Sequence, residues 1–325
     1  MITKESILSK YCISEEEFQD CEMTWEDLLY IYNDFAGAKE EHYKKVMEDF
    51  ISEYLKDINK NHRLSVGKEV HVHSIHYRVK DAEHLIVKII RKKRENNVKY
   101  KNLTRYNYEK FVMDLIGIRC LILFKDEWEN IHSYITSEFE NNDKCYIKDP
   151  IRDFDEDIHH RYIAEKPKVH IRNGDSRKQY EKIFSPSCVI DDKVYRSIHY
   201  IIKYKGVYLE LQVRTIFEEG WGEIDHSIVY PYFQGDPLLS EYTELLNRLA
   251  GLADEMGTFF HSLKMQEIKY LESDGSKPRN SKGAVREEIQ QNNVIIDGVT
   301  ETSVNLQYRE NSGTALNCRD RVIWE

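Results

Sequence analysis

Apolar residues recur every three or four positions through most of the segment 1–60, which is the spacing of one helix face. The clearest series runs from Trp25 to Phe35. Thr24 stands directly before this series and Asp27 follows it by three residues, an aspartate variant of the capping box that starts helices. We therefore predict that residues 1–60 are helical and that one helix begins after Thr24.

Farther along the chain, polar and apolar residues alternate or form short apolar runs, as they do in strands. The segments with these patterns are residues 68–80, 118–124, 194–204 and 207–215. Lys205-Gly206 separates the last two segments, which predicts a hairpin. Helical patterns lie between the strands, one starting after Asp81 and one over residues 127–140. The expected fold class is α+β, with a mixed β-sheet flanked by helices.

A wide apolar stripe at helical spacing runs from Leu239 to Leu263, within residues 238–270. Such a stripe either covers a sheet or pairs with a second copy of the chain. From Ser273 onward Ser, Gly, Asn, Arg and Glu dominate, which is typical of a segment with little order. The organisation that we expect is an N-terminal acidic helical segment (1–60), a central domain (61–235), a C-terminal amphipathic helix (236–272) and a polar tail (273–325).

Charge is unevenly spread along this chain of 325 residues, whose net charge is 47 − 57 = −10. Residues 14–57 contain fourteen acidic residues and four lysines, whereas residues 78–110 contain eleven basic and four acidic residues. A second basic stretch, 161–182, has seven basic and three acidic residues. An acidic protein that concentrates positive charge in two stretches is expected to bind a polyanion such as a phosphate chain. The alternative interpretation is a solvated helix surface at residues 91–94.

Several classes of protein are excluded by what the sequence lacks. The net negative charge argues against a protein that coats nucleic acid. No apolar run is long enough to cross a membrane and no basic-then-apolar N-terminus occurs, so neither a membrane span nor a signal peptide is expected. Six scattered cysteines without a CxxC pair predict a protein of a reducing compartment, the cytoplasm. Because no P-loop, HExxH or GxSxG motif occurs, side chains would have to hold any nucleotide.

Two groups of charged residues have the chemistry of a phosphate site. Lys80 and Lys88 are eight residues apart, so both could reach one phosphate chain if they share a helix. Asp114 lies at the edge of the strand expected at 118–124, and Arg119 follows it by five residues.

A third group lies in the last predicted strand. Glu210, Gln212 and Arg214 alternate with apolar residues and would project from one face. Asp114 and Glu210 on adjacent strands would form a Mg²⁺ site beside the lysines and arginines. The alternative is an ion-paired sheet face that binds no ligand.

Six short motifs follow one another in an order and at spacings that resemble the RelA/SpoT synthetase family. They are Arg78-x-Lys80, Lys88, Asp114-x-x-Gly-x-Arg119, Tyr195-Arg-Ser-Ile-His199, Glu210-x-Gln-x-Arg-Thr215 and Trp221-x-x-x-x-His226. The resemblance covers about residues 45–235. It implies a nucleotidyltransferase-like fold and a Mg²⁺-dependent GTP pyrophosphokinase, which transfers the β,γ-pyrophosphate of ATP to the 3′-hydroxyl of GDP or GTP. The product would be (p)ppGpp, the alarmone of the stringent response.

The resemblance also implies roles for individual residues. The ATP-binding residues would be Arg78 and Arg119, which stack on the adenine, and Lys80 and Lys88, which hold the phosphates. Asp114 would bind Mg²⁺, and Glu210 would lie beside the metal and help to deprotonate the acceptor 3′-hydroxyl. The residues of the acceptor site would be Tyr195, which stacks on the guanine, together with Lys168, His199, Gln212 and Arg214.

The chain departs from the family pattern before the stacking tyrosine. The basic Pro-Lys element of the family normally lies a few residues before that tyrosine, whereas here the segment 169–194 separates Pro167-Lys168 from Tyr195. We expect this segment to form an enlarged basic loop at the border of the acceptor pocket. No His-Asp dipeptide occurs, so the hydrolase domain of the bifunctional relatives is not expected, and the chain is similar to the small stand-alone synthetases.

Two other functions stay open. Toxin-type members of the family pyrophosphorylate the 3′ end of tRNA, and the basic stretch at 161–182 would suit an acceptor stem. A catalytically silent module that binds a nucleotide or a partner would keep the fold without the reaction. Because small relatives are often homotetramers, the resemblance also implies a homo-oligomer, which would form through the C-terminal helix.

Overall fold

The computed structural model describes residues 2–61, 70–95, 98–172, 175–193, 195–225 and 237–274. The chain divides into two compact units, one of residues 1–259 with 323–325 and one of residues 260–322. Of the second unit, the described part is the end of the last helix, which carries exposed apolar side chains such as Phe260 and Leu263. The predicted polar tail from residue 275 onward lies outside the described residues, as does His226 of the last motif. The four segments expected from the sequence stay a prediction.

The N-terminal segment up to Asn61 is largely helical, as predicted. The elements are α1 (Lys4–Lys10), α2 (Glu15–Gln19), α3 (Trp25–Asp34), α4 (Glu40–Phe50) and α5 (Ile58–Asn61), with the π-helical turns η1 (Phe35–Lys39) and η2 (Ile51–Leu55). The side chain of Thr24 caps α3 by accepting a hydrogen bond from the backbone N–H of Asp27 at 3.1 Å, which confirms the predicted start. At Gly37 the backbone takes φ 101°, a conformation that favours glycine, and this bend separates α3 from α4.

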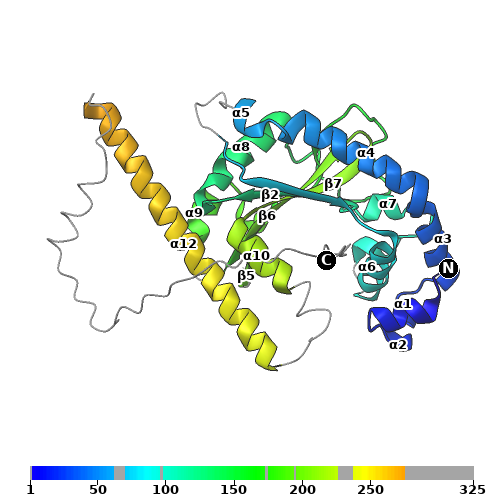
Figure 1. Ribbon diagram of the computed structural model, residues 1–325. Coiled ribbons are helices and arrows are strands. Elements are labelled where there is room, and N and C mark those ends of the chain that lie inside the picture. Colours follow the sequence, from blue (N-terminus) through cyan, green and yellow to red (C-terminus); the bar gives the residue numbers. More distant parts are fainter. Residues whose placement is uncertain are drawn as a thin grey trace, which may run out of the picture. The chain divides into compact units, whose positions relative to one another are not determined.

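A seven-stranded sheet forms the centre of the first unit (Figure 1). Its strands are β1 (Ser74–Val79), β2 (Ile116–Ile122), β3 (Tyr162–Ile163), β4 (Lys168–Arg172), β5 (Val189–Lys193), β6 (Ser197–Tyr204) and β7 (Val207–Thr215). The strand order is β1-β2-β7-β6-β4-β5, and β3 pairs with β6. The β2–β7 and β4–β5 pairs are parallel and the other pairs are antiparallel. The predicted α+β class with a mixed sheet is therefore confirmed.

The β6–β7 hairpin turns at Lys205 and Gly206, where the sequence predicts it. Both residues have positive φ, 46° and 80°. Two consecutive residues in this region match the right-handed twist of the strands they join, and glycine takes such a conformation without strain. This turn sets the register in which β6 and β7 pair, with His199 opposite Gln212.

Further helices follow the strands. They are α6 (Ala82–Arg94), α7 (Tyr108–Phe111), α8 (Trp128–Glu138), α9 (Arg177–Glu181), α10 (Ile216–Ile224) and α12 (Pro237–Asp274), with the 3-10 turns η3 (Val98–Tyr100), η4 (Lys125–Glu127) and η5 (Pro186–Cys188). Asp81 caps α6 by accepting a hydrogen bond from the backbone N–H of His84 at 3.0 Å, as predicted. Among the helices that the structure describes, none has an apolar stretch of the length that crossing a membrane needs.

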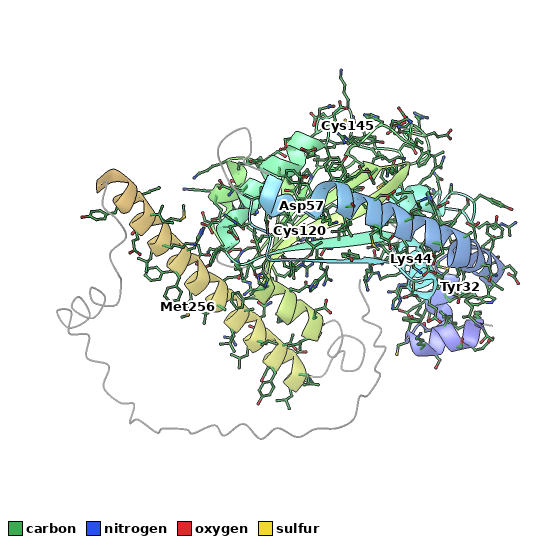
Figure 2. The ribbon with its side chains drawn as sticks, turned by 45° about the horizontal axis from the view of Figure 1, so that its top comes forward. Tyr32, Lys44, Asp57, Cys120, Cys145 and Met256 are labelled. Atoms are coloured by element: carbon green, nitrogen blue, oxygen red, sulfur yellow. The ribbon has the colours of Figure 1, made fainter. Side chains whose placement is uncertain are left out.

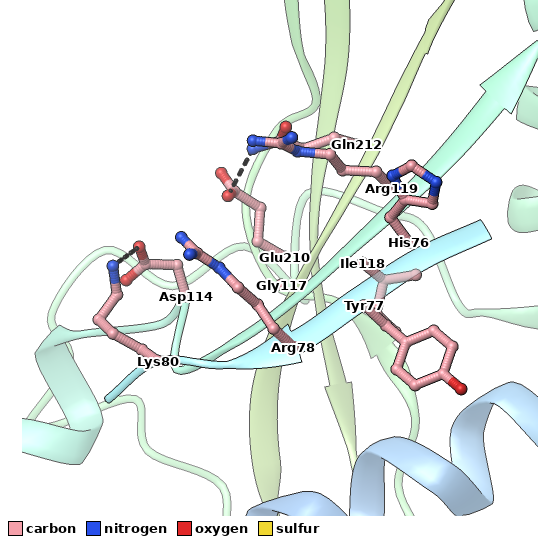
Figure 3. A pocket seen from close by; sticks show the side chains of 10 residues that line it. All are labelled: His76, Tyr77, Arg78, Lys80, Asp114, Gly117, Ile118, Arg119, Glu210 and Gln212. Carbon is pink, nitrogen blue, oxygen red and sulfur yellow. Dashed lines mark hydrogen bonds and ion pairs between the residues drawn. The ribbon is translucent and has the colours of Figure 1, made fainter. Parts of the chain in front are cut away.

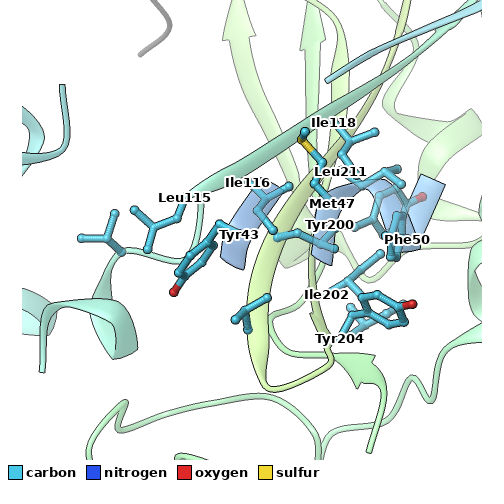
Figure 4. Packing of buried hydrophobic residues seen from close by; sticks show 14 of the residues in the cluster. Tyr43, Met47, Phe50, Leu115, Ile116, Ile118, Tyr200, Ile202, Tyr204 and Leu211 are labelled. Carbon is cyan, nitrogen blue, oxygen red and sulfur yellow. The ribbon is translucent and has the colours of Figure 1, made fainter. Parts of the chain in front are cut away.

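The hydrophobic core lies between one face of the sheet and the helices α4 and α8, which run across that face (Figure 1). Tyr43, Met47 and Phe50 of α4 pack against Ile116 and Ile118 of β2 (Figure 4). These residues stand at helical spacing on α4 and at alternate positions on β2. The apolar face of the helix and the apolar face of the strand therefore pack against each other. The remaining positions of the strands therefore face the other side of the sheet.

That second face of the sheet is polar along three of the seven strands, β1, β2 and β7. The side chains at alternate positions are those of His76 and Arg78 on β1, Arg119 on β2, and Glu210, Gln212 and Arg214 on β7. Helix α10 begins directly at the end of β7 and contacts this part of the sheet. A concentration of charge on a half-buried sheet face requires either internal ion pairs or a charged ligand.

The segment 169–194 is not the enlarged loop that the sequence led us to expect. Its first residues extend β4, which pairs with β6, and its last residues form β5 beside β4. Between the two strands, Tyr180 of α9 is buried and stacks on Trp128, with ring centroids 5.0 Å apart. The segment folds because its apolar residues alternate or cluster, so that Val169 and Ile171 join the core. Val194 lies outside the described residues.

The part of α12 up to Phe259, which belongs to the first unit, packs within that unit through a small and polar face rather than through its apolar stripe. Its buried residues up to position 259 are Asn247, Ala250 and Asp254, which lie at helical spacing. The apolar stripe on the other side stays exposed, and Met256, visible in Figure 2, is 60% exposed. Of the two roles considered for the stripe, covering the sheet is not the one seen here, because two buried arginines take polar partners from the opposite side of the helix.

Those two arginines are Arg172 at the end of β4 and Arg196 just before β6. The guanidinium of Arg172 donates to the backbone carbonyl of Asn247 at 2.5 Å, and that of Arg196 pairs with Asp254 at 2.7 Å. Gly251 allows the close approach, since a Cβ on this residue would collide with Nη1 of Arg172. Burying these charges is favourable only with such partners, and this selects the face of the helix that docks.

Candidate active site

The polar sheet face contains a pocket over the strands β1, β2 and β7 (Figure 3). Its lining residues are His76, Tyr77, Arg78, Lys80, Asp114, Gly117, Ile118, Arg119, Glu210 and Gln212. The strand register explains why they meet: Gly117 lies between Arg78 and Glu210, and Arg119 lies between His76 and Gln212. Residues that are far apart in the chain are thus brought onto one surface.

Asp114, Lys80 and Lys88 form a buried charge cluster at one side of the pocket. Oδ2 of Asp114 is 2.5 Å from Nζ of Lys88 and 3.3 Å from Nζ of Lys80. Lys88 comes from α6, whereas Lys80 lies just past the end of β1 and before the Asp81 cap. The eight-residue spacing allowed both lysines to lie on one helix, but only Lys88 does. The two side chains nevertheless converge on one carboxylate, that of Asp114.

Two positive charges against one carboxylate leave the cluster with a net positive charge. Burial alone would raise the pKa of Asp114, but the charges of Lys80 and Lys88 hold it well below its usual range. Burial lowers the pKa of Lys80, and the charge of Asp114 opposes this shift. The second carboxylate oxygen of Asp114, Oδ1, is buried and has no hydrogen-bond partner among the residues that the structure describes. An oxygen of this kind is available to a cation.

Glu210 is the second carboxylate of the pocket. Its Oε2 accepts a hydrogen bond from Nε2 of Gln212 at 2.8 Å, and its Oε1 is 3.3 Å from Nδ1 of His199. Burial alone would raise the pKa of Glu210, but the hydrogen bond and charge of His199 lower it to about 2. The carboxylate is therefore ionised at neutral pH.

Three guanidinium groups stand on the same face as these carboxylates. Burial lowers the pKa values of Arg78 and Arg119 to about 9 each, and the positive charge of Arg214 adds to the shift at Arg119. Two carboxylates of α10 compensate, because Nη1 of Arg119 lies 2.7 Å from Glu219 and 2.6 Å from Glu223. The planar guanidinium of Arg119 is thus held from the side of α10.

The residues expected at the acceptor site lie on or next to β4, β6 and β7. His199 pairs with Gln212 across β6 and β7, and Lys168 pairs with His199 across β4 and β6. The ring of Tyr195 has Arg214 at 5.9 Å and stacks on His170, with ring centroids 5.0 Å apart at an angle of 18°. The side chain of Lys168 is half exposed and lies 3.4 Å from Glu165.

Sequence reasoning missed three contributors to this region. His170 belongs to the segment that was expected to be a loop, so its stacking on Tyr195 depends on the β4–β6 pairing. Glu219 and Glu223 lie four residues apart on α10, the helix that follows the polar strand β7. That spacing puts both carboxylates on one helix face, and this signal could have identified them. Trp221, which was noted as part of a motif, donates from Nε1 to the carbonyl of Thr243 at 3.2 Å.

Comparison with known proteins gives a match to one family model. Residues 77–235 match the family model described as the region found in RelA / SpoT proteins. The chain therefore contains a RelA/SpoT region, and the resemblance expected from its six motifs is confirmed over these residues. No curated protein sequence gives a significant match to the chain.

Several solved structures are similar to this chain. Small alarmone synthetase 1 from Bacillus subtilis is 16% identical with a TM-score of 0.45, and the match covers 71% of this chain and 100% of that one. Small alarmone synthetase 2 from Bacillus subtilis is 19% identical with a TM-score of 0.44, covering 70% and 98%. A GTP pyrophosphokinase family protein from Streptococcus pneumoniae is 19% identical with a TM-score of 0.40, covering 79% and 100%.

Proposed function

We propose that this protein is an ATP:nucleotide 3′-pyrophosphokinase that makes (p)ppGpp from ATP and GDP or GTP. The observation that carries the proposal is that two ionised carboxylates, Asp114 and Glu210, line one pocket of a RelA/SpoT region, where Lys80 and Lys88 both pair with Asp114. In the reaction the acceptor 3′-oxygen bonds to the β-phosphorus of ATP, the bond between that phosphorus and the α,β-bridging oxygen breaks, and AMP leaves. Such a transfer depends on positioning and on neutralising oxygen charge.

Mg²⁺ fits the residues that the pocket provides. Magnesium sites use one or two carboxylates together with substrate phosphates, and the carboxylates of Asp114 and Glu210 meet that description. The buried Oδ1 of Asp114 has no hydrogen-bond partner among the described residues, which suits a cation ligand. When bound, the ion would neutralise phosphate oxygens and lower the proton affinity of a nearby hydroxyl.

The donor is proposed to lie over β1 and β2. Lys80 and Lys88 would bind the ATP phosphates, since two ammonium groups already surround one anionic oxygen at this point. Arg78 and Arg119 would stack on the adenine, because both are partly buried, planar and on the same sheet face. In this arrangement the phosphates of ATP point toward the two carboxylates.

The acceptor is proposed to lie over β6 and β7, with its base on Tyr195. Its phosphates would contact Lys168, His199, Gln212 or Arg214, all on or beside these strands. Glu210 would accept a hydrogen bond from the 3′-hydroxyl and so orient the attacking oxygen. Because the pKa of this carboxylate is only about 2, it takes the proton late, as the new bond to phosphorus forms.

A labelling experiment tests this function. The purified chain is incubated with Mg²⁺ and ATP labelled in the γ-phosphate, in one series with GDP, GTP or AMP and in another with bulk tRNA. We expect label in a guanosine polyphosphate, because the γ-phosphate moves with the transferred pyrophosphate. Label on tRNA alone would identify a toxin-type member instead, and label in no acceptor would favour a silent binding module.

Two arginines of the basic stretch at 161–182, on which the tRNA alternative rests, are already paired within the fold. Arg172 is buried and its Nη2 lies 2.7 Å from Glu218, and Arg177 pairs with Glu181 at 3.1 Å. Charges that are already paired inside the fold contribute little to phosphate binding. The other five basic residues of the stretch, Arg161, Lys166, Lys168, Lys178 and Lys182, are exposed, so the labelling experiment decides the tRNA alternative.

A homo-oligomer through the C-terminal helix is also expected. Tyr242, Leu249, Leu252 and Met256 are all more than half exposed on one side of α12. Exposed large apolar side chains in such a row are typical of an interface. Light scattering at micromolar concentration should therefore give a mass of at least two chains, and Leu252→Glu should shift that mass to one chain. A monomer in the unchanged protein would contradict this expectation.

A further inference from the structure

We propose that Glu219 is a positioning residue that joins the donor side of the site to the carboxylate Glu210, so that adenine contacts and reaction geometry depend on each other. This inference rests on the proposed function and deepens it. Glu219 lies in the first turn of α10, and its side chain is only 7% exposed. A carboxylate this deeply buried is stable only with charged or hydrogen-bonding partners.

The two oxygens of Glu219 point to different parts of the site. Oε1 lies 2.7 Å from Nη1 of Arg119 and 3.3 Å from Nδ1 of His76, both on the donor side. Oε2 lies 3.4 Å from Nη1 of Arg214 on β7. One carboxylate thereby bridges the guanidinium proposed for the adenine and an arginine of the acceptor side.

From Arg214 the contacts continue to the reacting centre. Nη2 of Arg214 donates to Oε1 of Gln212, and Nε2 of the same amide donates to Oε2 of Glu210 at 2.8 Å. An amide that accepts on one side and donates on the other has its orientation determined by both neighbours. Glu219 thus acts on Glu210 through two intermediate side chains of β7, those of Arg214 and Gln212.

Electrostatics explain why this bridge must be an anion. Burial lowers the pKa of Arg119, and the nearby charges of Arg214 and Arg78 lower it further. Three partly buried guanidinium groups repel each other unless carboxylates separate them. Removing the charge of Glu219 would let Arg119 and Arg214 move apart, and Gln212 would follow Arg214.

Glu223 provides a matched comparison within the same helix. It binds the same Nη1 of Arg119 at 2.6 Å, and its charge also acts on Arg78. Both of these partners belong to the donor side, and Glu223 is about a third exposed. The inference therefore predicts different kinetic effects for two carboxylates that share one arginine.

The test compares Glu219→Gln, Glu219→Asp and Glu223→Gln in steady-state pyrophosphate transfer with varied ATP. For Glu219→Gln we expect a rise in the KM for ATP together with a fall in kcat of about 10- to 100-fold, since small displacements of a reacting group have such effects. For Glu223→Gln we expect a rise in KM of similar size with a fall in kcat below about 3-fold, since its contacts serve binding. Glu41→Gln, on α4 at the other face of the sheet, controls for loss of a surface carboxylate.

Glu219→Asp guards against a trivial loss of folding. It keeps the negative charge but is one methylene shorter, so it cannot reach Arg119 and Arg214 together. We expect a kcat reduced by about 10-fold at an unchanged melting temperature, consistent with a geometric role. A wild-type kcat in Glu219→Asp, or the same kcat in Glu219→Gln and Glu223→Gln, would overturn the inference. An unmutated chain that transfers no pyrophosphate would instead contradict the proposed function.

Discussion

Replacing Glu210 by glutamine should abolish pyrophosphate transfer, with a fall in kcat of about 10²- to 10⁴-fold, the range typical of a lost acid–base group. Glutamine has the shape of glutamate and can still accept from Gln212, so the sheet should remain intact. What disappears is the negative charge that orients the 3′-hydroxyl and contributes to the proposed Mg²⁺ site. The measurement is the initial rate of label transfer from γ-labelled ATP, with the melting temperature as the control for folding. Activity within a few-fold of the unchanged protein would show that Glu210 is neither base nor metal ligand.

Acid unfolding gives a second readout for the same substitution. Burial alone would raise the pKa of Glu210, but the hydrogen bond from His199 lowers it from 4.5 to about 2. A depressed pKa in the folded state stabilises the protein above the unfolded pKa, and this contribution is lost as the pH falls from about 4.5 toward 2. Glu210→Gln should therefore unfold with a weaker pH dependence in that window, as followed by circular dichroism. An identical pH dependence would show that the carboxylate gains no such protection on folding.

Filling the floor of the pocket should remove ATP binding without disturbing the fold. Gly117 stands between Arg78 and Glu210 in the strand register, and a Cβ added there meets no atom within 4 Å. The side chain of Gly117→Val would project into the space proposed for the donor, and valine is favourable in a strand. We expect the affinity for a non-hydrolysable ATP analogue to fall by about 10- to 100-fold, because a blocked pocket loses several contacts with the ligand. Each tenfold fall corresponds to a loss of about 1.4 kcal/mol of binding free energy. The melting temperature should stay the same or rise.

Gly220 of α10 offers a matched control. A Cβ at this residue also meets no atom within 4 Å, but the residue is exposed and does not line the pocket. Gly220→Ala should leave the affinity for the ATP analogue unchanged, as measured by calorimetry. If Gly117→Val binds the analogue as well as the unchanged protein does, the donor lies elsewhere. If both glycine variants weaken binding equally, the effect arises from the backbone and not from the occupied space.

The local elements of this fold follow from short stretches of sequence. Thr24 and Asp81 start helices because each side chain accepts a hydrogen bond from a backbone N–H three residues later. Lys205-Gly206 turns the hairpin because both residues adopt positive φ. Each of these interactions involves residues within a few positions of one another, so sequence patterns are sufficient to predict them.

Segment 169–194 shows where local patterns fail. The expectation of an enlarged basic loop came from the departure from the family pattern between Lys168 and Tyr195, but β4 is a strand because β6, a distant part of the chain, lies beside it. The docking face of α12 shows the same limit. An apolar stripe normally packs inward, yet Arg172 and Arg196 require polar partners and therefore select the face with Asn247 and Asp254.

For the site itself, the sequence alone predicted the candidate residues, namely the carboxylates Asp114 and Glu210 together with nearby lysines and arginines, and their roles stay a proposal. Residue type and alternation predict such a set, because a strand sends every second side chain to one face. Only the tertiary structure decided that Lys80 and Lys88 approach Asp114 from different elements, and that Glu219 binds Arg119 and Arg214 at once. Contacts of this kind depend on strand register and on where a helix begins, and these are settled by packing across the whole first unit.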